Sequence, residues 1–336
     1  MYRQTPWRCF AFRGNDVGLW SRTCPTLLRP KAFASRQAHG SSSARLNPPA
    51  STRPPPLDVP SRDSVDSTMH YLVQLGKGYV RFYKDGIKAI WGNRKLLRQK
   101  LATMPARDRP SVFLPPRNVP EAFSRADWVL LWRVRHDLVR LPLFGLMLIV
   151  IGEFTALVVV FVDRVVPYTC RIPKQILSGT TRAENRRRSA FAELEARHPD
   201  GALGTSVTQA VARRHVLRSL DLAGGFWDAI GFMPPGMWLA KGRSRIIFLE
   251  GDDRRLVEEG GPVGLESAEL SIACRERGID TFGKTKNELC ALLSLWLRLT
   301  MAENPAERRR RMAVLLLTRP EKWPKQRNFT VPEWEL

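Results

Sequence analysis

The longest apolar run of the chain covers residues 141–162 and reads LPLFGLMLIVIGEFTALVVVFV, with Glu153 as its one ionisable residue. The hydrocarbon core of a bilayer needs about 20 residues of helix, and a helix satisfies its own backbone hydrogen bonds in lipid. A buried core helix is the alternative, but no other segment is apolar enough to cover this run on all sides. We therefore predict a single transmembrane helix over residues 141–162.

A single span would place the two flanks of this run on opposite sides of a membrane. Orientation follows the flank that carries more arginine and lysine, counted over about 20 positions. Each flank carries four such residues. The charge pattern therefore leaves the orientation open.

The segment before the run predicts one long helix and a loop. Residues 69–101 place apolar side chains at spacings of three and four, with lysine and arginine between them, which predicts an amphipathic helix. It would lie on an anionic membrane surface, or be an ordinary helix with a solvated face. Residues 103–120 contain five prolines and predict a loop. Ser124 suits the N-cap of a helix that continues into the apolar run.

The segment after the run predicts shorter helices. Charge and apolar spacing indicate helices at residues 184–197, 207–222, twice within 226–249, and at 254–259. Asp252 and Asp253 would cap the last of these. Together with Glu258 and Glu259, we interpret them as helix-end and surface carboxylates, not as a catalytic pair.

The best-formed motif is a compact helix–turn–helix in residues 265–297. Its first helix carries glutamates in the first turn and arginines in the last turn, which suits the helix dipole. Gly278 stands where a left-handed C-cap is needed, and Ile279 can pack back onto the helix. Thr285 and Glu288 form a capping box for a second helix that has leucines along one face.

The N-terminal residues 1–57 are rich in arginine, serine and proline, and their single acidic residue is Asp16. This composition is typical of a mitochondrial transit peptide, because a secretory signal requires a continuous apolar segment. A disordered basic tail is the alternative. Residues 36–43 suit cleavage, and residues 47–60 are expected to be a proline-rich linker without packing potential. Residues 58–140 then form an amphipathic helical region before the membrane.

Composition narrows the range of functions. The net charge of +22 favours acidic partners such as anionic lipid or nucleic acid. The five cysteines and five histidines form no CxxC or HExxH motif, which gives no support for a disulfide framework or a metal site. The chain has no P-loop, no dinucleotide-binding glycine motif and no GxSxG elbow. We therefore predict no enzyme, no cofactor and no small-molecule substrate.

Several separated stretches share one resemblance. They are residues 83–91 (YKDGIKAIW), residues 137–142 (DLVRLP) followed by Glu153 and Phe154, residues 256–260 (LVEEG), and a unit from Leu270 to Leu297 that contains Ala273-Cys274-Arg275 and Arg277-Gly278-Ile279. In order and spacing, over residues 70–325, they resemble the leucine-zipper/EF-hand transmembrane (LETM-type) family of the mitochondrial inner membrane, and in particular its ribosome-binding domain.

The resemblance implies a fold and a location. The span would sit in the inner membrane, with residues 163–336 in the matrix as a LETM-type ribosome-binding domain. That domain would be all-α and 14-3-3-like, ending in a SAP-like helix–turn–helix. The chain departs from the family at Val150, where a second proline often stands, and it has no D-x-D-x-D-G calcium loop and no heptad repeat after residue 300. We expect a reduced member that lacks the EF-hand and the coiled coil.

The first functional hypothesis is binding of mitochondrial ribosomes, in support of membrane insertion or assembly of newly made proteins, with inner-membrane lipid as a second partner. Arginine contacts to ribosomal RNA release counterions, so affinity should fall with salt. For any single residue, a solvated helix face is the alternative. The candidate contacts are Arg186, Arg187, Arg188, Arg213, Arg214, Arg243, Arg245, Arg308, Arg309, Arg310 and Arg311.

Two other hypotheses remain open. Glu153, with Asp137 and Arg140 near the start of the span, would serve potassium or calcium/proton exchange in mitochondrial cation homeostasis, because an intramembrane carboxylate is costly. One span cannot enclose a pore, so an exchanger requires a homo-oligomer. A protonated Glu153 packed against another helix is the alternative. The helix–turn–helix would bind nucleic acid through its basic residues, which are Arg275, Arg277, Lys284 and Lys286.

Overall fold

Helices make up the regular secondary structure in a computed structural model of the chain, and no strand occurs in the residues that the structure describes. These are residues 39–59, 68–116, 118–151, 165–199, 207–230, 232–234 and 236–336. They belong to one compact unit, residues 39–336. The predicted all-α class is confirmed for this part of the chain. Residues 1–38 of the predicted leader lie outside the described residues.

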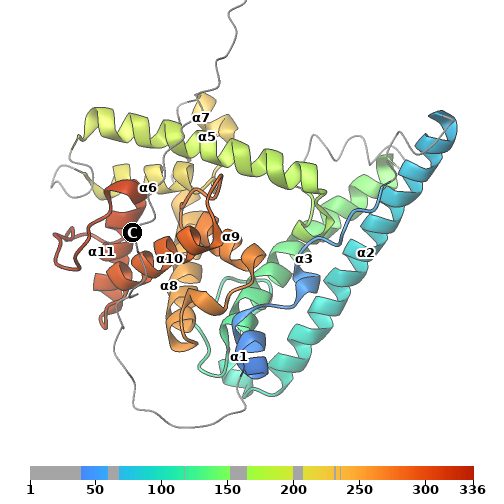
Figure 1. The fold of residues 1–336 in the computed structure, drawn as a ribbon, viewed down its shortest axis with the longest axis horizontal. Helices are drawn as coiled ribbons and strands as arrows, with labels where there is room; N and C mark the ends of the chain where they lie inside the picture. Colours follow the sequence, from blue (N-terminus) through green and yellow to red (C-terminus); the bar gives the residue numbers. More distant parts are fainter. Residues whose placement is uncertain are drawn as a thin grey trace, which may run out of the picture. The chain divides into compact units, whose positions relative to one another are not determined.

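Two long helices, α2 (Thr68–Ala102) and α3 (Arg125–Ile151), run antiparallel along each other (Figure 1). An ion pair of 3.3 Å between Lys100 Nζ and Asp127 Oδ1 joins the end of α2 to the start of α3. The helix predicted at residues 69–101 is confirmed by α2, whose buried side chains recur at helical spacing. Within the predicted loop between them, η3 (Ala106–Asp108) forms one 3₁₀ turn.

A short 3₁₀ helix, η5 (Tyr168–Cys170), is held between α2 and α3. Gly86 of α2 makes the close approach possible, because a Cβ there would lie 2.9 Å from both Cys170 Sγ and the carbonyl oxygen of the residue before it. On the other side, Asp137 Oδ1 of α3 accepts a hydrogen bond of 2.6 Å from Tyr168 N. The chain therefore comes back to α3 directly after the apolar run.

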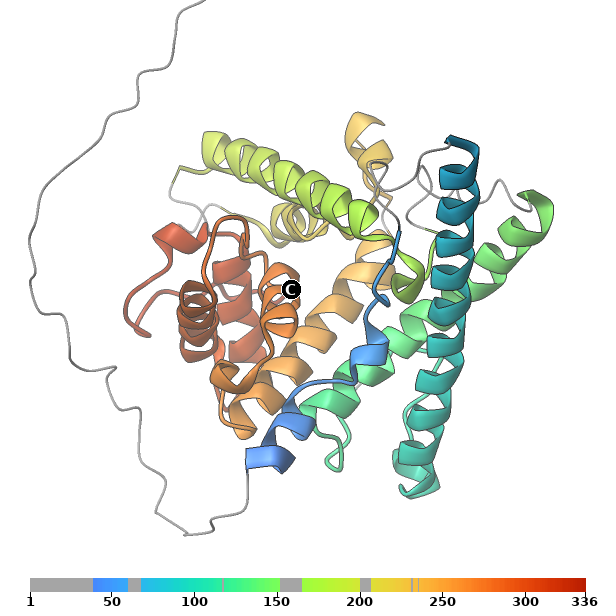
Figure 2. The ribbon, with the colours of Figure 1, turned by 45° about the vertical axis from the view of Figure 1, so that its right-hand side comes forward.

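The N-terminal segment, with α1 (His39–Leu46) and η1 (Ala50–Thr52), lies across α3 (Figure 2). The last side chain of α1 is 1 % exposed, and Asn47 Nδ2 donates to Gly264 O at 3.0 Å. The prediction of a linker without packing potential at residues 47–60 is therefore wrong for its first residues. Their polar side chains have partners far along the chain, which local composition does not reveal.

After the apolar run, α5 (Pro173–Arg197) packs against α6 (Gln209–Ser219). Both confirm predicted helices, but α5 begins well before the predicted residue 184. A proline at the first helical position suits a helix start. The side chain of Gln175 also accepts a hydrogen bond of 3.0 Å from Ile172 N, which satisfies a backbone donor at this end.

The region predicted to hold two short helices contains α7 (Gly225–Ile230) and a π-helical turn, η7 (Trp238–Gly242), which leads into α8 (Arg243–Glu258). Asp252 and Asp253 lie inside α8 and are fully buried. The prediction that they cap a separate short helix, and lie at the surface, is wrong because α8 is continuous through them.

The predicted helix–turn–helix is confirmed by α9 (Ser267–Glu276) and α10 (Lys286–Thr300). Gly278 has a φ of +78°, a left-handed conformation that favours glycine and ends α9. The capping box also forms: Thr285 N donates to Glu288 Oε2 at 2.7 Å, and Glu288 N donates to Thr285 Oγ1 at 3.3 Å.

The C-terminal helix α11 (Pro305–Leu316) packs on α10 and also contacts α8. Two further 3₁₀ turns, η8 (Pro262–Gly264) and η9 (Pro320–Lys322), lie before α9 and after α11. One hydrophobic core takes in buried side chains of α2, α3, α8, α9, α10 and α11. The segments before and after the apolar run therefore share a core.

This shared core corrects the predicted single-pass arrangement. Trp128 of α3 is buried, and its Nε1 donates to Phe248 O of α8 at 3.1 Å. Residues before and after the run therefore cannot lie on opposite sides of a membrane in this fold. Within the described residues, no helix combines the length and the apolar character that crossing a membrane requires. α3 contains residues 141–151 of the predicted span, whereas Glu153 lies outside the described residues.

Candidate functional site

A buried charge network centred on Arg277 joins four helices. Arg277 Nη2 lies 2.6 Å from Asp252 Oδ2, and Arg277 Nε donates to Asp253 Oδ1 at 2.9 Å. Arg125 of α3 forms an ion pair of 2.9 Å with Asp252. Trp296 Nε1 of α10 donates to Asp253 at 2.8 Å. All five side chains are buried, so the network binds α3, α8, α9 and α10 to one another.

Pairing and burial compete in setting the charge of this network. Burial opposes the charge of Arg277, but Asp253 and Asp252 outweigh burial and raise its pKa. Burial also opposes ionisation of Asp252, but Arg125 and Arg277 prevail and lower its pKa. For Asp253, burial prevails and raises its pKa. These carboxylates are interior structural groups.

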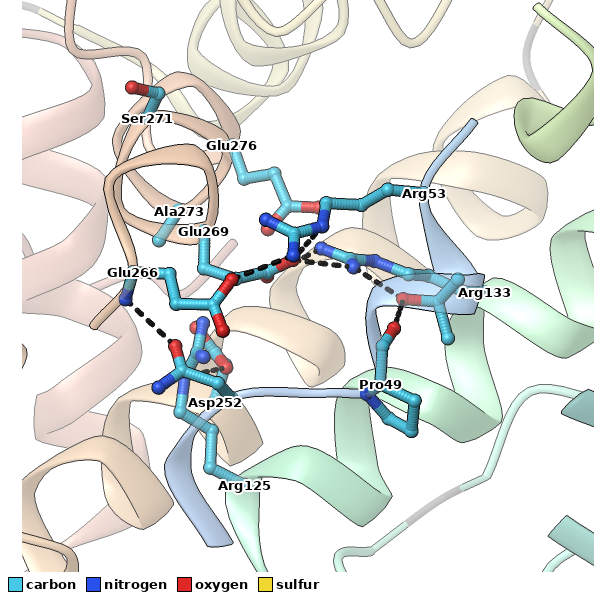
Figure 3. Close-up of polar contacts among 12 residues, drawn as sticks. Pro49, Arg53, Arg125, Arg133, Asp252, Glu266, Glu269, Ser271, Ala273 and Glu276 are labelled. Carbon is cyan, nitrogen blue, oxygen red and sulfur yellow. Dashed lines mark hydrogen bonds and ion pairs between the residues drawn. The ribbon is translucent and has the colours of Figure 1, made fainter. Parts of the chain in front are cut away.

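A second network attaches the N-terminal segment to α9 (Figure 3). The guanidinium of Arg133 on α3 makes two parallel hydrogen bonds, of 2.9 and 2.8 Å, to the buried carboxylate of Glu269. Arg133 Nη1 also donates to Thr52 Oγ1 at 2.9 Å. Arg53 Nη2 donates to Glu266 Oε2 at 2.7 Å. Two-pronged arginine–carboxylate pairs fix geometry well, so the first described residues are an integral part of the domain.

The candidate arginines on α5 fall into two classes. Arg186 pairs with Asp228 at 2.6 Å and also with Asp221. Arg187 is buried and donates to Ser219 O at 3.1 Å. Arg188 pairs with Glu184 at 3.5 Å and with Asp280 at 3.3 Å, but it keeps 60 % of its side chain exposed. The first two hold α5 to the segment around α6 and α7, so Arg188 is the α5 residue placed to meet an external partner.

The candidate arginines on α6 and α8 lie on neighbouring elements, because α6 packs against η7. Arg213 stacks over the Trp238 ring at 5.4 Å. Arg245 pairs with Glu276 at 3.3 Å. Arg214 and Arg243 are exposed. Because α5 packs against α6 as well, the candidate arginines of α5, α6 and α8 lie on adjoining elements.

The four arginines of α11 are half-buried. Arg308 Nη2 donates to Ala302 O at 2.7 Å, Arg309 pairs with Glu250 at 3.1 Å, and Arg311 pairs with Glu307 at 2.7 Å. These contacts are internal to the domain. The basic run therefore contributes to the packing of α11, and its role as a ribosome contact stays a prediction.

The candidates for ion exchange that the structure describes have internal contacts. Asp137 is buried, and its carboxylate accepts hydrogen bonds from Tyr168 N at 2.6 Å and Thr169 Oγ1 at 3.1 Å. Arg140 Nη1 donates to His136 O at 3.2 Å. Asp137 thus has a structural role at η5, and the exchange hypothesis stays a prediction.

Two of the four basic residues of the helix–turn–helix, Arg275 and Arg277, make contacts inside the domain. Arg277 belongs to the buried network, and Arg275 Nη1 donates to Thr180 Oγ1 of α5 at 2.7 Å. Lys284 is half-buried and Lys286 is exposed. Nucleic-acid binding by this unit stays a prediction, with the two lysines as its better placed residues.

Sequence reasoning missed Arg125, Arg133 and Glu269. Each stands at a helical position that faces the core, where charge is costly unless it is paired. The one sign in the sequence was Glu269, an acidic residue among the positions of α9 that are buried. Its partner could not be identified from the sequence, because that partner lies on α3.

One comparison with known proteins gives a match. Residues 236–319 match the family model described as LETM1-like, RBD, which takes in η7, α8, α9, α10 and α11. No curated protein and no solved structure matched the chain. The recognition of a LETM-type chain from its motifs is confirmed over these residues, whereas residues 83–91 and 137–142 lie outside the match.

Proposed function

From the LETM1-like ribosome-binding domain at residues 236–319, we propose that this is a mitochondrial inner-membrane protein whose matrix domain binds mitochondrial ribosomes. In that position it supports membrane insertion or assembly of newly made proteins. The match to the family model is the observation that carries the proposal. The basic, acid-poor leader supports the mitochondrial location.

The exposed arginines give the proposal a physical basis. Arg188, Arg214 and Arg243 present guanidinium groups on adjoining helices. The phosphate backbone of RNA is a dense anionic surface, and its affinity for such groups falls steeply with salt because counterions are released. A salt-sensitive interaction is therefore expected.

The test is co-sedimentation of the full chain, purified in mild detergent, with mitochondrial ribosomes at low and high salt. A fragment that starts after the apolar run is unsuitable, because it lacks Arg125 and Trp128, which are buried against α8. We expect binding at about 50 mM salt that weakens at least tenfold by about 200 mM. Binding at neither salt concentration would contradict the proposal.

A triple variant separates specific contacts from general charge. Arg188→Gln, Arg214→Gln and Arg243→Gln together should weaken ribosome binding about tenfold, at about 0.5 kcal/mol per exposed contact. The matched control is Arg81→Gln, Lys84→Gln and Arg98→Gln, which removes the same charge from exposed positions of α2. Equal loss in both variants would show that net charge, not this surface, drives binding.

The apolar run remains in the proposal as a membrane contact, but not as a single span. The described part of α3 exposes Leu143, Leu146 and Ile149, the last at 82 %. Exposed apolar side chains in a continuous stretch mark an interaction with lipid or protein. Since the described flanks of the run share one core, the proposal places both flanks on the same side of the membrane.

A further inference from the structure

The exposed side of α2 carries a row of basic side chains, here called the basic row. Its members stand three or four positions apart, or seven where Trp91 intervenes, and this spacing places them on one face of a helix. All are exposed, and Trp91 is 50 % exposed. The basic row comprises Lys77, Arg81, Lys84, Lys88, Lys95 and Arg98. It extends over about 32 Å at 1.5 Å per residue.

The basic row points away from the rest of the domain. Phe82, Gly86 and Asn93 are buried on the face of α2 that packs against α3, η5 and η1. A lysine follows each of them by two positions, and a helix turns about 200° over two residues. The basic row therefore lies opposite the buried face of α2.

No partner within the described part of the chain neutralises the basic row. None of its six cations forms an ion pair or a side-chain hydrogen bond with a residue that the structure describes, whereas Lys100 of the same helix pairs with Asp127. Asp85 is the single acidic residue of α2 and stands outside the row. Exposed cations in a continuous row favour an anionic partner.

An exposed apolar stripe borders the basic row in the first half of α2. Met69 is 71 % exposed and Val80 is 68 % exposed. Leu72 and Val73, which lie between them, are exposed as well. Val73 and Val80 lie four and three positions from Lys77, so the apolar stripe and the basic row are neighbours on the helix surface. A partner of this side of α2 meets both.

The apolar stripe lies next to the apolar run. Helices α2 and α3 are antiparallel (Figure 1), and the rings of Tyr83 on α2 and Phe144 on α3 have centroids 6.1 Å apart. The residues of α2 before Tyr83 therefore lie along the described end of α3. Leu146 and Ile149 are exposed there. The apolar stripe thus adjoins the surface that we propose to contact the membrane.

We infer that α2 is a second membrane contact, with its basic row on the phosphates of anionic phospholipids and its apolar stripe at the boundary with the acyl chains. Helices that combine these two surfaces bind in the plane of the membrane interface. Trp91 suits this position, because tryptophan is enriched at the level of the headgroups. RNA would neutralise the basic row but leave the apolar stripe uncovered. The inference rests on the proposed membrane attachment.

The test is lysine footprinting of the full chain in phosphatidylcholine vesicles with or without phosphatidylglycerol. A membrane-impermeant amine reagent is added, and mass spectrometry measures the modification of each lysine. Phosphatidylglycerol should slow the reaction of Lys77, Lys84 and Lys88 about fivefold, because a cation near an anionic surface gains about that factor. Lys286 and Lys325 are exposed on α10 and in the C-terminal segment. Their reaction should change little, and it corrects for repulsion of the reagent by the vesicle.

A charge variant links this protection to the basic row. Lys84→Gln with Lys88→Gln should reduce the lipid-dependent protection of Lys77 from about fivefold to about twofold or less. Lys286→Gln with Lys325→Gln removes the same charge from exposed positions outside α2. This control should leave the protection of Lys77 in place, because exposed charges beyond about 10 Å are screened.

Each outcome decides the inference. Equal reactivity of the α2 lysines in both kinds of vesicle overturns it, and so does equal protection by an RNA oligonucleotide without phosphatidylglycerol. Flotation tests the membrane attachment separately. Flotation with phosphatidylcholine vesicles without protection of the lysines retains the attachment and overturns the inference. Flotation that requires phosphatidylglycerol supports α2 as the contact in place of the run, and flotation with neither contradicts both.

Discussion

Asp137 and Tyr168, 31 residues apart in the chain, are joined by a hydrogen bond of 2.6 Å between Tyr168 N and Asp137 Oδ1. Every residue of the apolar run lies between them in the sequence. The described part of α3 beyond Asp137, residues 138–151, is about 21 Å long at 1.5 Å per residue. That length is less than the roughly 30 Å of a bilayer core.

The hydrogen bond between Asp137 and Tyr168 predicts that both flanks of the apolar run are accessible from the same side of the membrane. Ser111→Cys and Thr330→Cys place thiols at exposed positions before and after the run. In mitoplasts, a membrane-impermeant maleimide should label both positions or neither, and detergent should expose both. Labelling of one position alone in intact mitoplasts would restore a single span.

Gly86 predicts a steric effect on stability. Gly86→Ala places a methyl group 2.9 Å from Cys170 Sγ and from a backbone carbonyl, and such overpacking costs about 1–3 kcal/mol of the free energy of unfolding. Gly92 lies on the same helix, and a Cβ at that position would have nothing within 4 Å. Gly92→Ala should therefore gain about 0.5–1 kcal/mol from helix propensity.

Urea unfolding of the purified chain measures both glycine variants. Opposite signs for the two substitutions are the expected result, because they differ in the space around the new methyl group. A loss of stability of the same size in both would show that α2 does not approach η5 as closely as the structure has it.

The buried network predicts a large effect for one arginine. Arg277→Met leaves Asp252 and Asp253 buried with less compensating charge, and breaking a buried pair in this way costs about 3–5 kcal/mol. Arg254 pairs with Glu258 at the surface, so Arg254→Met should cost about 0–1 kcal/mol. Denaturant midpoints at constant slope would measure the difference. Near-equal midpoints for the two variants would refute a structural role for the network.

His215 predicts an acid-dependent loss of stability. Burial, with a smaller contribution from Arg218, lowers its pKa to about 4, against about 6.5 in an unfolded chain. Between these values the unfolded state binds more protons, so stability falls as the pH is lowered. The expected loss from this group is about 3 kcal/mol by pH 4.

A comparison of two histidine variants isolates this effect from the titration of carboxylates. His215→Leu should flatten the dependence of the free energy of unfolding on pH between 6.5 and 4, relative to the unchanged chain. His70→Gln alters an exposed histidine of α2 and should leave that dependence in place. An unchanged slope in His215→Leu would mean that another group is responsible.

Local signals in the sequence predicted much of the fold. The period of α2 and the caps at Gly278 and Thr285 act within a few residues, so sequence alone identified these elements. The pairing of Asp252 with Arg125 acts across the fold. An acidic pair inside a helix has the same composition as an acidic pair at a helix end, and the sequence could not distinguish them.

The sequence predicted which domain contains the candidate site, but not which of its arginines are exposed. The motifs of α8, α9 and α10 indicated the matched domain, which the family model confirms. The exposure of individual arginines was not predictable, because Arg186 and Arg188 differ by two positions in one helix and have opposite environments. A helix turns about 200° over two residues, so partners on the neighbouring helix decide which arginine remains exposed.

The attachment of Asn47 to Gly264, 217 positions later, has a consequence for the order of folding. Contacts of such long range slow folding, because the chain must close a large loop before it gains the contact. The unit therefore completes last at its N-terminus, the part of the chain that is made first.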